Sequence, residues 1–198
     1  MLRFGGLGPG AVHLCVDMQR MFAEDTEWRT PWMERVLPNV IRLVERRPER
    51  TIFTRFIPAA EPGRGAGTWR RYYERWASMT RERLGADMLD LVAPLARHVP
   101  PALVVDKPIY SPWFGPGLHA ALTALRPDAL VISGLETEVC VLATVLGAID
   151  HGYRTVIATD AICSSADSTH DAMLEIYGGR FGMQVETAAT EELLDALA

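Results

Sequence analysis

The sequence is poor in cysteine, in positive charge and in long apolar runs. Its three cysteines among 198 residues form an odd, sparse set, which favours a reducing compartment over a secreted fold built on disulfides. Its 20 lysines and arginines stand against 25 aspartates and glutamates, and the net charge of −5 argues against a basic nucleic-acid surface. No apolar run reaches the roughly 18 residues of a membrane span, and the N-terminal segment holds no apolar core of signal-peptide length. We therefore expect a cytoplasmic protein that binds neither nucleic acid nor membranes.

Short apolar runs rich in β-branched residues alternate with segments of helical periodicity. The expected strands are residues 12–16, 51–57, 103–106, 129–133, 155–159 and 183–187. The expected helices are residues 31–46, 118–125, 138–150, 168–177 and 191–197. Runs that are apolar throughout are typical of parallel strands covered on both faces, and the alternation favours layers of helix around a sheet. The sequence thus predicts one α/β domain, residues 1–198, with a three-layer α/β/α fold around a six-stranded, mainly parallel sheet.

The first expected helix, residues 31–46, has a clear start signal and one internal conflict. Thr30 is suited to cap its N-terminus, and Pro31 is suited to its first position. Pro38 lacks the backbone N–H that a helix interior needs, so it predicts a kink or a break.

Residues 58–101 interrupt the alternation with a Pro/Gly-rich loop followed by an aromatic and basic segment. The spacing of Trp69, Tyr72, Tyr73 and Trp76 places all four on one helical face, which suits either packing or a substrate cage. We expect an elaborated crossover between two strands. Three roles are open for this crossover: a surface loop without a function of its own, a lid over a site, or an oligomer contact.

Polar residues end three of the expected strands, where parallel α/β sheets bind their ligands. Asp17 follows the first strand, Lys107 ends the third, and Cys140 lies near the first turn of the helix after the fourth. The unpaired N–H groups and dipole of that turn, with a lysine nearby, favour a thiolate at Cys140. Asp17 could accept the thiol proton and later return it to a leaving amine. The set suits attack on an amide-like carbonyl.

Asp106 and Lys107 are neighbours, so their side chains point to opposite sides of the strand end. Only one of them can face the site directly. We expect Lys107 to do so and Asp106 to make a structural hydrogen bond.

The residues around Cys140 carry a resemblance to a known family. The segment Ser133-Gly-Leu-Glu-Thr-Glu-Val-Cys-Val141, followed by Thr144, Ala148, Gly152-Tyr153 and Asp160-Ala161, strongly resembles the isochorismatase-like cysteine hydrolase superfamily, over nearly the whole chain. The resemblance implies a catalytic triad of Asp17, Lys107 and Cys140. In it the aspartate acts as general base and then acid, the cysteine forms a thioester and the lysine supports both. It also implies a cis peptide at Leu135–Glu136, and an oxyanion hole made by the backbone N–H groups of Glu136 and Cys140.

Two departures from the family pattern narrow the expected function. Members that cleave isochorismate lack the cysteine, so Cys140 favours hydrolysis of a C–N bond. Nicotinamidase-type members bind a metal through an Asp-x-His pair and a later histidine after the second strand. Residues 54–62 contain neither, and no histidine occurs between His13 and His98. We therefore expect no metal and no other cofactor.

Five residues are candidates for the substrate pocket. Gln19 and Phe22 follow Asp17, Tyr110 and Trp113 follow Lys107, and Trp76 belongs to the aromatic stripe. Structural packing is the alternative for each.

Four further residues are expected to have structural roles. Cys15 and Cys163 suit buried packing, Thr137 suits a turn or cap beside the oxyanion loop, and His170 resembles a helix-start residue rather than a catalyst.

The predicted activity is cofactor-free cleavage of a C–N bond in a small amide, ureido or carbamoyl substrate, through a Cys140 thioester and with release of ammonia or an amine. One alternative is nicotinamidase-like or isochorismatase-like hydrolysis of a ring substrate. The other is a non-catalytic binding protein of the same fold, which would need none of the triad residues. Because the family commonly forms dimers or tetramers, the resemblance implies a homo-oligomer.

Overall fold

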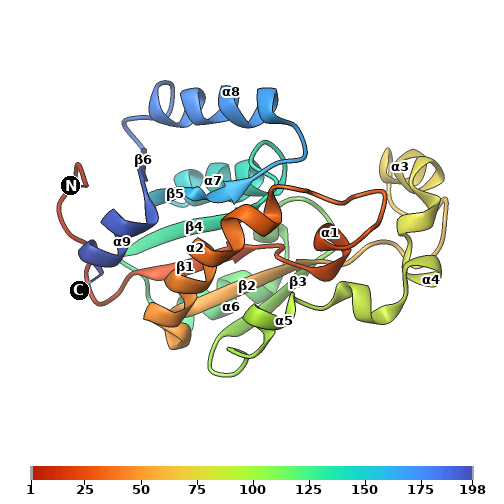
Figure 1. Ribbon diagram of the computed structural model, residues 1–198, viewed down its shortest axis with the longest axis horizontal. Helices are drawn as coiled ribbons and strands as arrows, with labels where there is room; N and C mark the ends of the chain where they lie inside the picture. Colours follow the sequence, from red (N-terminus) through yellow and green to blue (C-terminus); the bar gives the residue numbers. More distant parts are fainter. Residues whose placement is uncertain (1, 198) are drawn as a thin grey trace.

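A six-stranded parallel sheet forms the centre of the computed structural model, which describes residues 2–197. In spatial order the strands are β3 (Leu103–Lys107), β2 (Thr51–Phe56), β1 (Val12–Val16), β4 (Ala129–Leu135), β5 (Arg154–Cys163) and β6 (Val185–Ala188). All neighbouring pairs run parallel, and the carboxyl ends of the strands lie together on the right in Figure 1. The expected architecture is confirmed, and the sheet is wholly rather than mainly parallel.

Helices cover both faces of this sheet. One face packs against α2 (Met33–Arg46), α5 (Ala93–Ala96) and α9 (Thr190–Ala196), and the other against α6 (Pro116–Leu125), α7 (Cys140–Asp150) and α8 (Asp167–Gly178). Alternate residues of β1 enter opposite cores: Leu14 and Val16 pack towards α6 and α7, whereas Cys15 packs towards α2. Two separate hydrophobic cores therefore support the same sheet.

The expected helix at residues 31–46 differs from the observed α2 in two ways. It begins at Met33, whose N–H donates to the carbonyl of Thr30. The expected break at Pro38 was wrong, because α2 continues through this residue to Arg46. Pro38 lies on the exposed side, while the opposite side buries apolar residues such as Val36 and Val40 against the core. That burial outweighs the loss of one hydrogen bond.

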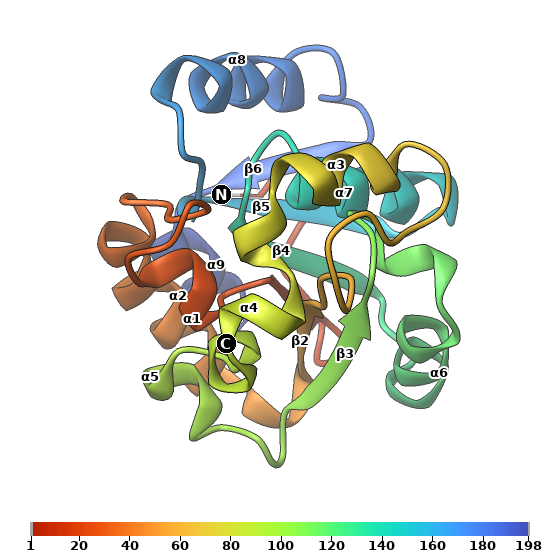
Figure 2. The ribbon, with the colours of Figure 1, turned by 90° about the vertical axis from the view of Figure 1, so that its right-hand side faces the viewer.

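Residues 57–102 connect β2 to β3 and form the expected elaborated crossover. They contain α3 (Trp69–Arg75) and α4 (Arg81–Leu84), which lie beyond the carboxyl ends of the strands and face the viewer in Figure 2. The N–H of Arg81 donates to the carbonyl of Ala59, which ties α4 back to the start of the crossover. The crossover therefore stands over the edge of the sheet where ligands are expected.

The centre of this edge lies between β1 and β4, where the strand order reverses direction and parallel α/β sheets form a crevice. Close approach of the two strands requires Gly134, which has a φ of +108°. A Cβ atom on this residue would lie 2.0 Å from the carbonyl oxygen of Val16. The short helix α1 (Arg20–Ala23) follows β1 at the same edge. Within residues 2–197, no helix is long and apolar enough to cross a bilayer.

Candidate active site

Asp17 follows the last residue of β1 with its carboxylate buried at the crevice. Its φ of +53° is in the left-handed region, which aspartate tolerates better than most residues. Its Oδ1 accepts a 2.6 Å hydrogen bond from the hydroxyl of Thr54 on β2, and the same hydroxyl accepts from the Asp17 N–H at 3.2 Å. Thr54 thus holds the carboxylate in one orientation, a role for which the sequence showed no signal.

Lys107, the last residue of β3, joins the other two candidate residues. Its Nζ lies 2.6 Å from Asp17 Oδ2 and 3.3 Å from Cys140 Sγ, and it also donates to the carbonyl of Ile109 at 3.3 Å. Burial lowers the pKa of Lys107, but the charge and hydrogen bond of Asp17, with those of Cys140, outweigh burial, so the pKa is raised. The ammonium is therefore charged. Lys107 is also the only lysine in the sequence.

Cys140 is the first residue of α7 and so lies in the first turn, as expected, although the helix begins two residues later than predicted. The predicted thiolate was wrong. Burial, followed by the negative charge of Asp17, raises the pKa of the thiol well above its ordinary value. The ammonium of Lys107 lowers the pKa by less than these two effects raise it. The resting group is a thiol beside a carboxylate, so its activation requires transfer of a proton.

The loop between β4 and α7 leads from the crevice to Cys140. The Leu135–Glu136 peptide bond is cis. Neither the N–H of Glu136 nor that of Cys140 donates to an acceptor among residues 2–197. These are the two groups expected from the sequence to form an oxyanion hole.

Thr137 anchors that loop to β5 and α8. Its N–H donates to the carbonyl of Cys163 at 3.0 Å, and its carbonyl accepts from the hydroxyl of Tyr177 at 2.8 Å. Its own hydroxyl lies 2.8 Å from Nδ1 of His170. Thr137 is therefore a buried anchor beside the oxyanion loop, and His170 contacts the loop rather than the cavity. The contribution of Tyr177 was missed, because this residue lies on α8, 40 residues after Thr137 in the sequence.

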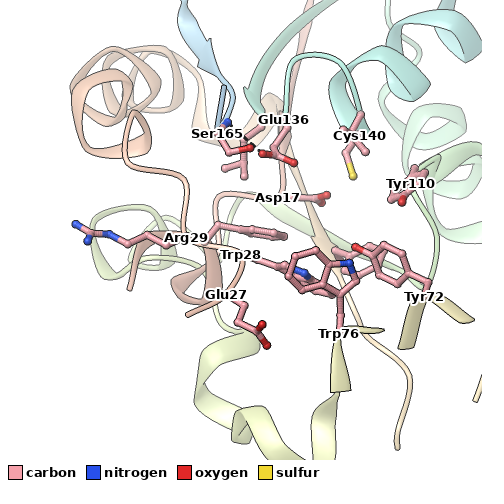
Figure 3. Close-up of a pocket in the computed structure, with 14 residues that line it drawn as sticks. Asp17, Glu27, Trp28, Arg29, Tyr72, Trp76, Tyr110, Glu136, Cys140 and Ser165 are labelled. Carbon is pink, nitrogen blue, oxygen red and sulfur yellow. Dashed lines mark hydrogen bonds between the residues drawn. The ribbon is translucent and has the colours of Figure 1, made fainter. Parts of the chain in front are cut away.

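A cavity of about 260 Å³ lies beside Cys140 and Asp17 (Figure 3). Besides these two, its walls are formed by Phe22, Glu27, Trp28, Arg29, Phe56, Tyr72, Trp76, Tyr110, Leu135, Glu136, Val139 and Ser165. The volume lies slightly below the usual range of about 300–1,000 Å³ for small-molecule pockets. The cavity therefore suits a compact ligand.

Three of the five expected pocket residues line this cavity: Phe22, Trp76 and Tyr110. The sequence missed Trp28, whose ring lies within 6.3 Å of those of Phe22 and Trp76 between centroids. Trp28 comes from the irregular segment after α1, where no periodic pattern marks a side chain as facing a site.

Gln19 and Trp113 are the other two expected pocket residues, and neither lines the cavity. The Gln19 amide is buried, donating to the carbonyls of Phe56 and Leu89 at 3.0 and 2.9 Å. It fastens the end of β1 to β2 and to the crossover. Trp113 packs against α7 on the far core, where its Nε1 donates to the carbonyl of Thr144 at 2.9 Å. Both were wrongly assigned because nearness in sequence does not determine where a side chain points.

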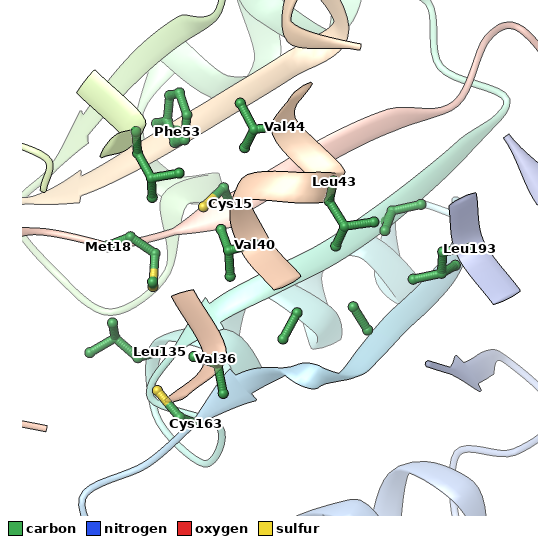
Figure 4. Packing of buried hydrophobic residues seen from close by; sticks show 14 of the residues in the cluster. Cys15, Met18, Val36, Val40, Leu43, Val44, Phe53, Leu135, Cys163 and Leu193 are labelled. Atoms are coloured by element: carbon green, nitrogen blue, oxygen red, sulfur yellow. The ribbon is translucent and has the colours of Figure 1, made fainter. Parts of the chain in front are cut away.

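The remaining expectations concern structural residues. Asp106 makes two hydrogen bonds with Arg55, at 2.8 and 2.9 Å, on the side of β3 away from Lys107. Cys15 and Cys163 are buried in the core beneath α2 (Figure 4). In the described part of the chain, no group of three or more His, Cys, Asp or Glu side chains is arranged to hold a metal ion.

Residues 11–189 match the isochorismatase domain family. The chain belongs to the isochorismatase family. A probable inactive nicotinamidase of Arabidopsis thaliana is 28% identical over 166 residues, which are 80% of this chain and 83% of that protein. The N-carbamoylsarcosine amidase of an Arthrobacter species is 27% identical over 199 residues, or 97% and 73% of the two chains.

The fold of this isochorismatase-family protein also matches solved structures. A cysteine hydrolase from Pseudomonas syringae pv. phaseolicola superposes with a TM-score of 0.82 at 20% identity, covering 97% of this chain and 94% of that one. The expected superfamily is confirmed, and the chain is an isochorismatase-family hydrolase.

Proposed function

We propose that this isochorismatase-family hydrolase cleaves a C–N bond of a small amide, ureido or carbamoyl compound, with Cys140 as nucleophile. One observation carries the proposal: Lys107 Nζ contacts both Asp17 and Cys140, at 2.6 and 3.3 Å, at the base of a substrate-sized cavity. A carboxylate, an ammonium and a thiol have no structural need to be buried together. Together they supply a base, a fixed positive charge and a nucleophile.

The first half of the reaction forms a thioester. Asp17 takes the proton of the Cys140 thiol, and the sulfur attacks the carbonyl carbon of the substrate. Lys107 keeps its proton and offsets the negative charge that moves between its two neighbours. Asp17 then gives the proton to the leaving nitrogen, the C–N bond breaks, and ammonia or an amine departs.

The oxyanion of each tetrahedral intermediate needs donors that are not already in use. The N–H groups of Glu136 and Cys140 meet this condition among residues 2–197, and loss of one such donor typically lowers the rate about 10²–10³-fold. In the second half, Asp17 takes a proton from water, which attacks the thioester carbonyl. The C–S bond breaks, and the proton returns to Cys140.

The substrate class follows from the pocket and from the relatives. A volume of about 260 Å³ admits a compact molecule, and one relative is named for its action on N-carbamoylsarcosine. Another relative is named as a probable inactive nicotinamidase. Its name supports two alternatives: hydrolysis of a ring amide, and a binding protein without turnover.

The test is ammonia release from a panel of small amides, ureides, carbamoyl amino acids and nicotinamide, with chelator present. Wild type and Cys140→Ala are compared, and Cys15→Ala serves as the matched control because Cys15 is buried in the core. We expect release that is lost in Cys140→Ala and kept in Cys15→Ala. Release that survives in Cys140→Ala would place the nucleophile elsewhere, and binding of panel compounds without release would favour the binding protein.

A further inference from the structure

Aromatic rings make up most of the cavity wall opposite Cys140. Six of them line it: Phe22, Trp28, Phe56, Tyr72, Trp76 and Tyr110. The ring of Trp28 contacts those of Phe22, Phe56, Tyr72 and Trp76, with centroids 5.8–6.3 Å apart. In Figure 3 the rings of Trp28, Tyr72 and Trp76 gather below Asp17 and Cys140. The rings therefore form one continuous wall rather than scattered contacts.

The polar atoms of this wall offer little to an anion. The Trp28 indole nitrogen is buried, without a hydrogen-bond partner and without exposed surface towards the cavity. The rings of Tyr72 and Tyr110 pack edge to face with centroids 6.4 Å apart, and burial raises the pKa of both phenols, so both stay neutral. The wall thus presents mainly ring faces, which carry the negative part of the aromatic quadrupole.

The charged side chains of the lining also favour a cation over an anion. Three are carboxylates, on Asp17, Glu27 and Glu136, and among the described lining residues the one cation is Arg29. Asp17 is neutralised by Lys107. In Figure 3 the guanidinium of Arg29 points away from Cys140 and from the rings. Glu27 lies 3.7 Å from the guanidinium of Arg75, which is outside the lining, so Glu136 is the one lining carboxylate without an ion-pair partner among residues 2–197. No cation of the lining is placed to pair with a substrate carboxylate.

We propose that the substrate is a small amide whose non-reacting end carries a quaternary or tertiary ammonium group, held by this aromatic wall. The inference rests on the proposed function, since it places the amide carbonyl at Cys140. A desolvated alkylammonium gains from ring faces and from the carboxylates of Glu27 and Glu136. A neutral group of the same shape gains only from burial, and a carboxylate meets like charge without a counter-ion.

The decisive experiment uses three matched amides. The first is trimethylammonioacetamide. The second is its carbon isostere, in which a tert-butyl group replaces the trimethylammonium group, and the third is malonamate, which carries a carboxylate. We expect kcat/KM for the cation to exceed that for the neutral isostere by about tenfold or more, with malonamate the poorest. Equal or better turnover of the neutral isostere or of malonamate would overturn the inference and leave the amidohydrolase intact.

Binding separates the two proposals if turnover fails. Cys140→Ala retains the aromatic wall, so titration of each amide can be followed by tryptophan fluorescence. Tighter binding of the cation without turnover in wild type would sustain the ammonium site and contradict the proposed reaction. Equal binding of the cation and its isostere would overturn the ammonium site, whatever the turnover.

Two Glu→Gln variants test where the preference for a cation arises. Glu27→Gln removes a carboxylate at the outer end of the wall and keeps an acceptor for the Ser78 hydroxyl that it contacts. Glu49→Gln removes the same charge just before β2, at the opposite end of the strands. We expect the cation-to-isostere ratio to fall several-fold in Glu27→Gln and to stay unchanged in Glu49→Gln. An unchanged ratio in both would contradict the role given to Glu27.

Discussion

The ammonium of Lys107 and the carboxylate of Asp17 lie 2.6 Å apart, with only 3% and 1% of the two side chains exposed. Removing two charges from water costs several kcal/mol per ion, and their mutual attraction repays it only in part. The ion pair therefore contributes little to the net stability of the fold. In the proposed reaction the pair supplies a base and a fixed positive charge beside Cys140.

A double-mutant cycle separates these two roles. Lys107→Met leaves the Asp17 carboxylate buried and unpaired, which should lower the free energy of unfolding by about 3–5 kcal/mol. Adding Asp17→Asn removes that charge, so stability should largely return while turnover stays lost. Urea unfolding and ammonia release measure the two effects.

Arg55 provides the control for this cycle. Its pair with Asp106 joins β2 and β3 and is partly exposed, at 26% and 49% of the side chains, so Arg55→Met should cost about 1 kcal/mol or less. If the double mutant is no more stable than Lys107→Met, the unpaired Asp17 carboxylate is not the cause of the lost stability.

Iodoacetamide should modify Cys140 before the other two cysteines. Of the three, only Cys140 lines the cavity, whereas Cys15 and Cys163 lie in the core. Burial raises the pKa of all three thiols, so access distinguishes them. We expect mass spectrometry to show labelling at Cys140 at least about tenfold faster, because access and thiolate formation control the rate.

The same reagent tests Asp17 as the base. Because the charge of Asp17 raises the pKa of the Cys140 thiol, Asp17→Asn should speed the labelling of Cys140 at neutral pH. It should still abolish ammonia release, since no carboxylate then carries the proton to the leaving nitrogen. Uniform slow labelling of all three cysteines in wild type would contradict a poised nucleophile.

Tyr177→Phe should loosen the oxyanion loop. The variant removes the hydroxyl that donates to the Thr137 carbonyl at 2.8 Å and leaves that buried carbonyl unsatisfied, at a cost of about 1–3 kcal/mol. We expect kcat to fall while KM changes little, because the displaced N–H groups act on the oxyanion rather than on the bound amide.

His170 allows an independent check of the same anchor. His170→Gln can still bond to the Thr137 hydroxyl, whereas His170→Leu cannot, so kcat should fall in the second variant only. Equal losses in the two variants would indicate a packing role for His170 instead.

His13 should make the protein less stable in mild acid. It is buried on β1 with Nε2 2.7 Å from the Ser133 hydroxyl, and burial lowers its pKa from 6.5 to about 3. The unfolded chain therefore binds a proton more readily than the folded protein. The stability that neutral His13 contributes is present above pH 6.5 and is lost as the pH falls towards 3.

The measurement is urea unfolding between these pH values, with His13→Gln alongside wild type. We expect a shallower decline in the variant, since glutamine does not titrate. Parallel curves would assign the acid sensitivity to the carboxylates.

The sheet and the three strand-end residues could be predicted because both depend on local patterns. Continuous apolar runs indicate buried parallel strands, and parallel strands bring Asp17, Lys107 and the start of α7 to one edge. The prediction of a thiolate at Cys140 was wrong because the sequence shows where a helix begins but not how deeply its first residue is buried. At Cys140 burial and Asp17 raise the pKa by more than Lys107 lowers it.

The aromatic wall could be predicted only in part. Tyr72 and Trp76 belong to a recognisable stripe, but Trp28 reaches the cavity from an irregular segment whose course depends on tertiary contacts. Trp113 shows the opposite error. It follows Lys107 closely in sequence, yet it packs against Gly147, where a Cβ atom would lie 2.1 Å from its ring.

The sole lysine of the sequence has a practical consequence. Because Lys107 is buried against Asp17, the described surface offers amine-directed crosslinkers and acylating dyes no lysine side chain. Acylation of Lys107 requires the centre to open and the ammonium to lose its proton. The rate of acylation at Lys107, followed by mass spectrometry, therefore reports how often the active site opens transiently.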